Sequence, residues 1–241
     1  MFKGIIGSGL ITAGGFLATL ENTQPGSLEA LYKCDDASGA VTDSGGNGHD
    51  LDVITGTPVY QVAGKITGTD AIQWPSTASS ARRDSSTLFA TLPAEWTIHW
   101  LYRFDFNVGA LAGLFCFDNS ADADPSLQVR TAGDGTGLFV FGNSDAGVNH
   151  TNFTTSDGVL VVGDWHSVVL RRKSGMVDLI VNNVVVGNQS TTQGTTTFDQ
   201  TCVNTRTATL GQTRGTHQFG AYWSTGLTDA ELTTLFALTG I

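Results

Sequence analysis

The chain has 241 residues, of which 40 % are hydrophobic and 14 % are charged, and its formal net charge is −10. Nucleic-acid binding depends on clustered Lys and Arg, so nucleic acid is not an expected partner of so acidic a chain. The 30 glycines and the low charge favour many short strands and tight turns over helices. A chain of this length can bury a full core as one domain without disulfides or metals.

Residues 1–25 differ in composition from everything that follows. They are apolar and glycine-rich as far as Leu20, and they end at the turn signal Gln24-Pro25-Gly26. The glycine content is too high for the apolar helix of a signal peptide, no clean cleavage site follows, and the stretch is too short for a transmembrane span. Because Met1 is retained, we expect an extended arm that docks on a neighbouring protein, with an extra edge strand on its own domain as the alternative. The expected docking residues are Ile5, Ile6, Leu10, Ile11, Phe16 and Leu17.

Residues 26–241 carry patterns typical of strands, beginning with Leu28–Tyr32. In the segment 96–104 every second side chain is large and apolar, as a half-buried strand requires. The members of this row are Trp96, Ile98, Trp100, Tyr102 and Phe104. Such a row can form a sugar-stacking platform, but the core of a sandwich is the preferred interpretation. Asn182-Asn183, between β-branched runs, predicts a type I′ hairpin, because asparagine tolerates positive φ.

One helix is predicted, near the end of the chain. Thr228 and Glu231 form a capping box, in which each side chain accepts a hydrogen bond from the backbone amide of the other residue. Leu232, Leu235 and Phe236 supply its apolar stripe, and Gly240 ends it. The pattern therefore predicts one all-β domain that closes with a short C-terminal helix.

The three cysteines are Cys34, Cys116 and Cys202. An odd number without close spacing argues against a disulfide framework and against a zinc site. We expect three buried, reduced thiols in a chain made in a reducing cytoplasm. One disulfide with one free thiol is the alternative.

Short motifs follow one another in a fixed order between residues 27 and 240. They are Leu31-Tyr32-Lys33, Asp35-Asp36, the turn 43–48, Gly64-Lys65, the segments 95–100 and 163–169, the hairpin 180–183 and the segment 226–232. Taken together they resemble the laminin-G-like, concanavalin A-like jelly-roll family. The resemblance implies an all-β, two-sheet antiparallel jelly-roll sandwich over residues 26–241, preceded by the arm. Asn182-Asn183 replaces the family's usual Asn-Gly, and the segment 218–223 lacks the usual acidic residue, which puts any role of that carboxylate in doubt.

The glutamates give no sign of catalysis. Glycoside hydrolysis needs two carboxylates about 5–10 Å apart, and the enzymes that this family contains place them as E-x-D-x-x-E on one strand. The chain has only Glu21, Glu29, Glu95 and Glu231, none in that pattern. The five histidines are dispersed and no G-x-S-x-G motif is present. We therefore expect no catalytic residues and no enzyme.

Calcium is the one cofactor that the resemblance implies, since laminin-G-like domains often hold it at the rim of the sandwich. Carboxylate and carbonyl oxygens are its ligands. The oxygen-rich segment 118–124 offers Asp118, Asp122 and Asp124. A solvated hairpin loop is the alternative interpretation of this segment.

The functional hypothesis combines the arm with the sandwich. We expect a non-enzymatic structural or attachment protein of a virus particle, most readily a bacteriophage head decoration or fibre component. The arm would dock on capsid or tail proteins or on further copies of the chain, and the sandwich would meet surface glycans, with many copies adding avidity. A carbohydrate-binding or adhesion module secreted by a cell is the alternative, and a glycoside hydrolase or lyase comes third.

Overall fold

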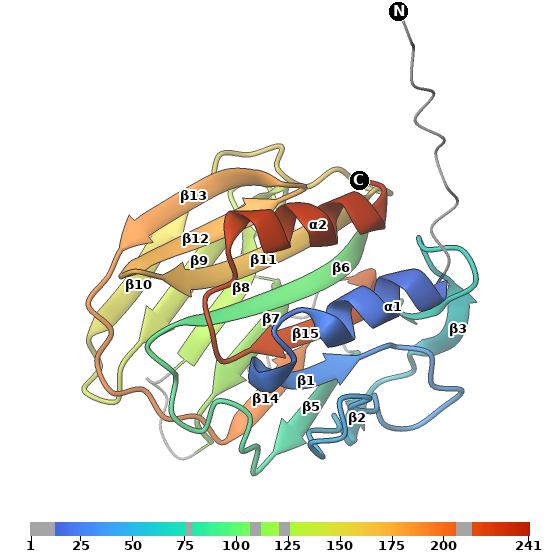
Figure 1. Cartoon of the computed structure of the whole chain (residues 1–241), viewed down its shortest axis with the longest axis horizontal. Coiled ribbons are helices and arrows are strands. Elements are labelled where there is room, and N and C mark those ends of the chain that lie inside the picture. The colour runs from blue at the N-terminus through green and yellow to red at the C-terminus, as the bar shows by residue number, and fades with distance from the viewer. Residues whose placement is uncertain (1–12, 76–78, 107–111, 121–125, 206–213) are drawn as a thin grey trace, which may run out of the picture.

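The computed structural model describes residues 13–75, 79–106, 112–120, 126–205 and 214–241. Within these residues two antiparallel sheets face each other, and two helices lie over the outer side of the larger sheet (Figure 1). The bounds in chain order are α1 Ala13–Asn22, a 3-10 turn Pro25–Ser27, β1 Leu28–Tyr32, β2 Val53–Thr55, β3 Val59–Ala63, β4 Asp70–Trp74, β5 Ser80–Asp84, β6 Trp96–Phe106, β7 Gly113–Asp118, β8 Ser126–Ala132, β9 Gly137–Asn143, β10 Asn149–Thr154, β11 Trp165–Lys173, β12 Met176–Val181, β13 Val184–Ser190, β14 Gln200–Val203, β15 Arg214–Trp223 and α2 Asp229–Thr239.

The strand order confirms the predicted two-sheet sandwich. In the described part of the chain, the eight-stranded sheet has the order β13-β12-β11-β6-β15-β4-β3, and β1 also pairs with β15. β4 pairs with residues 215–217 of β15 and β1 pairs with residues 220–223, so β4 and β1 follow one another along the same side of β15. The seven-stranded sheet has the order β10-β9-β8-β7-β14-β5-β2.

The core between the sheets contains the aromatic row predicted on β6. All five members of the row are at most 1 % exposed. The Trp100 indole donates a hydrogen bond of 2.8 Å to the Tyr222 hydroxyl, and the Tyr32 ring stacks on Trp100 with centroids 5.8 Å apart. The prediction of a core row is thus confirmed, and the row offers no surface for a sugar.

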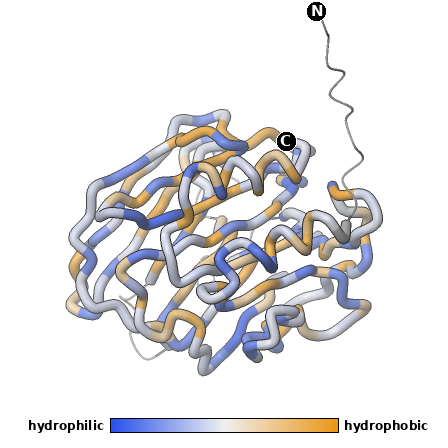
Figure 2. Tube along the Cα trace, viewed as in Figure 1, coloured by the Kyte–Doolittle hydropathy of each residue, from blue (hydrophilic) through white to orange (hydrophobic). Residues whose placement is uncertain are grey.

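A second core lies between the helices and the outer face of the eight-stranded sheet. α2 buries Leu232, Leu235 and Phe236, and α1 buries Phe16 and Leu20. Hydrophobic residues recur along both helices (Figure 2). Neither helix of the described chain has the length and hydropathy that crossing a bilayer would need.

Within the segment expected to be an extended arm, residues 13–22 form helix α1, which packs on its own domain. The Phe16 ring lies 4.5 Å from the Phe219 ring, and Leu17 is half-buried beside the same core. The Trp223 indole donates to the carbonyl of Thr23 at 2.8 Å. Glycine disfavours an isolated helix, but burial of a stripe against the sheet outweighs that preference here. Phe16 is therefore not available to a neighbouring protein, whereas Ile5, Ile6, Leu10 and Ile11 lie outside the described residues.

The predicted hairpin and cap are both present. Asn182 and Asn183 have φ of 51° and 64°, as a type I′ turn demands. The Thr228 hydroxyl accepts from the Glu231 amide at 3.2 Å, and a Glu231 carboxylate oxygen accepts from the Thr228 amide at 2.7 Å. Gly240 ends α2 with φ of 64°.

Two fully buried histidines make stability depend on pH. Burial lowers the pKa of His99 to about 4 and that of His217 to about 3. The unfolded chain takes up these protons near pH 6.5, whereas the folded chain does not, so the stabilisation present above pH 6.5 is lost as the pH falls toward 4. For His99 the loss amounts to about 3 kcal/mol. Urea unfolding of H99Q between pH 7.5 and 4.5 should show a shallower pH dependence than wild type. Parallel curves for the two proteins would contradict this prediction.

Candidate functional site

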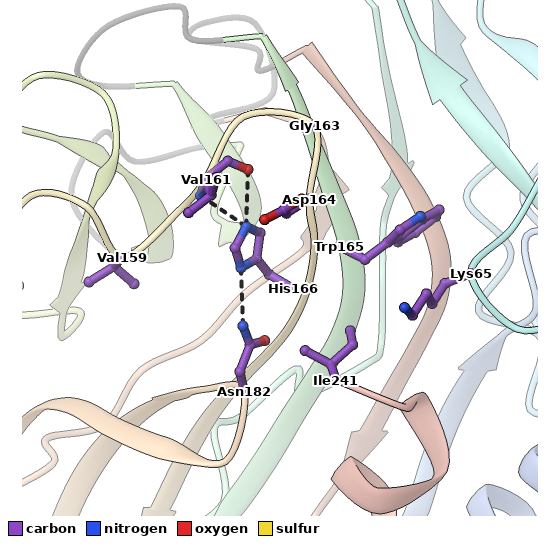
Figure 3. A pocket seen from close by; sticks show the side chains of 9 residues that line it. All are labelled: Lys65, Val159, Val161, Gly163, Asp164, Trp165, His166, Asn182 and Ile241. Atoms are coloured by element: carbon purple, nitrogen blue, oxygen red, sulfur yellow. Dashed lines mark hydrogen bonds between the residues drawn. The ribbon is translucent and has the colours of Figure 1, made fainter. Parts of the chain in front are cut away.

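A pocket of about 390 Å³ opens at one end of the eight-stranded sheet, next to the C-terminal residue (Figure 3). Its lining comes from the β3–β4 turn, the loop before β11, the first two residues of β11, the β12–β13 turn and the last residue of the chain. The lining residues are Lys65, Val159, Val161, Gly163, Asp164, Trp165, His166, Asn182 and Ile241. We call it the Trp165 pocket. Its volume lies within the range of small-molecule sites, roughly 300–1,000 Å³.

A tight turn over residues 161–164 forms one wall. The Asp164 amide donates to the Val161 carbonyl at 3.1 Å, and Gly163 has φ of 89°, which a residue with a side chain rarely adopts. The Gly163 amide and the Asp164 carbonyl are hydrogen-bonded to the backbone of Phe104, at 2.7 and 3.2 Å. The turn is therefore fixed to β6, and β11 starts directly after it with Trp165.

His166 clamps this turn to the hairpin turn at Asn182. Its Nε2 lies 3.0 Å from the Val161 amide nitrogen and 3.3 Å from the Val161 carbonyl, and its Nδ1 lies 3.3 Å from the Asn182 side-chain nitrogen (Figure 3). The Asn182 side-chain oxygen accepts from the Ser167 amide at 2.9 Å, which fixes the orientation of that amide group. Two turns that are far apart in sequence are thus joined through one buried imidazole.

The imidazole of His166 is neutral in this arrangement. Burial lowers its pKa, although its hydrogen bond to Val161 and the Asp164 carboxylate oppose that shift. The Val161 amide donates to Nε2 at 3.0 Å and the Asn182 NH₂ group faces Nδ1, so both ring nitrogens meet an N–H donor. An imidazolium would set an N–H on Nδ1 against the Asn182 donor, so His166 serves to position the turns and is a poor candidate for acid–base chemistry.

Gln218 fixes the backbone of the β3–β4 turn that carries Lys65. It lies in a β-bulge, because His217 pairs with Tyr102 and Phe219 pairs with Leu101. Its side-chain oxygen accepts from the Lys65 amide at 2.8 Å and from the Ile66 amide at 3.2 Å, and its nitrogen donates to the Thr69 hydroxyl. Gln218 therefore holds the β3–β4 turn.

Trp165 supplies the aromatic surface of the pocket. Its ring is half-buried, and the Arg103 guanidinium lies 5.5 Å from the ring centroid. Arg103 is itself held by an ion pair with Asp105 and a hydrogen bond of 3.2 Å to the Thr216 hydroxyl. Across the described residues, the indole N–H of Trp165, the Lys65 ammonium and the Asp164 carboxylate have no partner. An aromatic ring with one free cation and one free carboxylate suits a small polar ligand with apolar C–H faces.

Of the three residues proposed for calcium from the sequence, only Asp118 lies within the described residues. Asp118 ends β7, and one of its oxygens accepts from the Asn119 amide at 3.1 Å. Asp122 and Asp124 lie outside the described residues. No cluster of three or more His, Cys, Asp or Glu side chains suited to a metal is found in the described part of the chain. Calcium binding at Asp118 stays a prediction.

The Trp165 pocket is not predicted by the sequence motifs. Residues 163–169 belong to the ordered set of motifs on which the family resemblance rests. A glycine-containing turn directly before an exposed carboxylate and a tryptophan was the available local signal, since binding residues concentrate on turns fixed by a rigid scaffold.

Replacing Gln218 should release the β3–β4 turn. Q218A leaves the buried amide of Ile66 and the amide of Lys65 without their acceptor, and we expect a loss of about 2–4 kcal/mol in the free energy of unfolding. Hydrogen exchange at these two amides should accelerate. The control is Q61A, which removes an exposed glutamine from neighbouring β3. Equal stability of Q218A and Q61A would contradict the anchoring role.

Comparison with known proteins establishes the fold and no more. No protein-family model and no curated protein matches the chain. Among solved structures, the binding domain of Paraclostridial Mosquitocidal Protein 1 matches 88 % of this chain with a TM-score of 0.68 and 14 % identity. The binding domain of Botulinum Neurotoxin DC, in complex with SialylT, matches 89 % with a TM-score of 0.63 and 9 % identity, and Trypanosoma rangeli sialidase in complex with sialic acid matches 89 % with a TM-score of 0.67 and 10 % identity.

The match covers only part of each of these proteins. The chain spans 52 % of the mosquitocidal binding domain, 51 % of the neurotoxin binding domain and 33 % of the sialidase. What the three proteins share with this chain is the jelly-roll β-sandwich.

Proposed function

We propose that this chain is a non-catalytic glycan-binding module whose ligand occupies the Trp165 pocket. The observation that carries the proposal is that one pocket is lined by Trp165, whose indole N–H has no partner, and by the unpaired side chains of Lys65 and Asp164. Sugars combine hydroxyl groups with apolar C–H faces. A pocket lined by an aromatic ring, one cation and one carboxylate can meet both kinds of surface at once.

The chemistry of the pocket favours binding over catalysis. Among the described lining residues Asp164 has the only carboxylate side chain, whereas glycoside hydrolysis uses a pair of such side chains. His166 is engaged on both nitrogens. The pocket therefore offers hydrogen bonds and an apolar surface, without the paired acid and base of a hydrolase.

The comparisons support the proposal at the level of scaffold. Two of the three similar structures are named as binding domains, one of them in complex with SialylT, and the third was solved with sialic acid. The same sandwich is thus used in proteins that meet glycans. The location of the ligand in this chain rests on the pocket itself.

For the setting we keep the expectation drawn from the sequence, a virus particle, with secretion by a cell as the alternative. Its support is the apolar, glycine-rich composition of residues 1–12. Since α1 is occupied by packing on its own domain, the docking residues of this proposal are Ile5, Ile6, Leu10 and Ile11. Capsid or tail proteins and further copies of the chain are the proposed partners.

Glycan binding is tested by screening the wild-type chain on a glycan array and titrating the best ligand. W165F, K65A and D164A should each weaken the affinity roughly tenfold, because each removes one hydrogen-bonding or charged group from the pocket. The melting temperature should be retained in K65A and D164A, whose side chains are exposed.

The matched control is D52A, which removes an exposed carboxylate near the edge of the other sheet. It should bind like wild type. Absence of any glycan signal would overturn the function, and binding that all three pocket variants leave unchanged would overturn the site.

Removal of residues 1–12 tests the docking role separately. The truncated chain should keep its melting temperature and its glycan affinity, because α1 begins at Ala13 and the pocket lies in the sandwich. It should lose association with large particles or with further copies, measured by sedimentation of native material. Unchanged sedimentation would contradict a docking role for these residues.

A further inference from the structure

Two of the three cysteines lie opposite each other on neighbouring strands of the seven-stranded sheet. Cys202 of β14 is the direct partner of Cys116 of β7 in the antiparallel register. Their chain neighbours Phe115, Phe117 and Val203 belong to the core between the sheets. Because side chains alternate along a strand, Cys116 and Cys202 share the outer face of the sheet.

The register brings the two sulfur atoms within bonding reach. Directly opposed residues of an antiparallel pair have Cβ atoms about 4.5–5.5 Å apart, and a disulfide needs Cα atoms about 4.4–6.8 Å apart with Cβ atoms at roughly 3.5–4.5 Å. A small approach of the side chains suffices, without a change of strand pairing. The two thiols already interact through a side-chain hydrogen bond. Burial is the main cause that raises the pKa of Cys116, and this hydrogen bond with Cys202 is the second.

Cys34 is separated from this pair. It follows β1 of the opposite sheet and belongs to the core between the sheets. The backbone of the seven-stranded sheet thus lies between Cys34 and the outer face that carries the pair. All three thiols are free and buried in the structure.

We propose that Cys116 and Cys202 are a modification site that closes to a cross-strand disulfide when the chain folds in an oxidising compartment. With oxidised glutathione as the oxidant, one cysteine thiolate attacks the glutathione disulfide and releases one reduced glutathione. The second cysteine then attacks the protein sulfur of the mixed disulfide and releases the other. Two thiol protons and two electrons pass from the protein to glutathione, and one S–S bond forms.

Burial determines when the bond forms and how long it lasts. Both side chains have 0 % exposure, so an oxidant reaches them before the sheet is complete and not afterwards. Once formed, the bond is equally shielded from reductants. It ties β7 to β14 and closes the long stretch of chain between residues 116 and 202, which restricts the unfolded state.

The test is refolding of the full chain from denaturant in glutathione redox buffer, followed by alkylation, trypsin digestion and mass spectrometry. The three cysteines fall on separate tryptic peptides, residues 34–65, 104–130 and 174–206. We expect the last two peptides to be joined, with Cys34 alkylated. The oxidised protein should melt higher than the reduced protein, by roughly 5 °C. Folded, reduced protein given the same buffer should stay unlinked.

Variants separate this pair from other pairings. C34S should retain the linked peptides, whereas C116S and C202S should lose them. If either serine variant fails to fold, the peptide map of the wild-type chain decides the matter alone. Three alkylated cysteines after oxidative refolding, or a linked peptide that contains Cys34, would overturn the proposal. Neither result bears on glycan binding, which is measured independently.

Discussion

The antiparallel pairing of β6 with β15 is the constraint on which the rest of the structure depends. These strands are central in the eight-stranded sheet and bury side chains on both faces. Their inner face contributes Trp100 and Tyr222 to the core between the sheets, while the outer face gives Leu101 and Phe219 to the core under the helices. If the outer face of the eight-stranded sheet were polar, no helices would be needed to cover it. Because this face is apolar, α1 and α2 are required to cover it.

The same pairing also determines where the pocket lies. The bulge on β15 turns Gln218 toward the β3–β4 turn, and the partner of Arg103 on the other side of β6 is Trp165. Gln218 of β15 thus holds the backbone at Lys65, and Arg103 of β6 pairs with Trp165. The bulge therefore fixes the side of the pocket that carries Lys65, and β-bulges commonly serve to redirect a side chain in this way.

Local patterns predicted the regular parts of the fold. The alternation on β6, the Asn182-Asn183 turn and the Thr228 cap each depend on residues adjacent in sequence, so their physical cause is visible there. α1 was missed because its stripe is short and glycine-rich, and it becomes helical only against the outer face that Phe219 offers. The pocket was missed for a related reason. It joins three turns whose proximity depends on strand order, and strand order has no local signature.

The construction of the pocket bears on how it can bind. Buried side chains hold its turns in place: Gln218 is hydrogen-bonded to the turn that carries Lys65, and His166 joins the turns at Asp164 and Asn182. The backbone of these turns therefore loses little conformational entropy on binding. If the pocket binds a glycan as proposed, its few polar groups favour an arrangement in which several copies act together. The net charge of −10 opposes long-range attraction to acidic surfaces, but at physiological ionic strength this field fades within about 8 Å. For the proposed ligand, recognition would therefore be decided by contacts inside the pocket, where Lys65 is the one cation among the described lining residues, and not by the field of the whole domain.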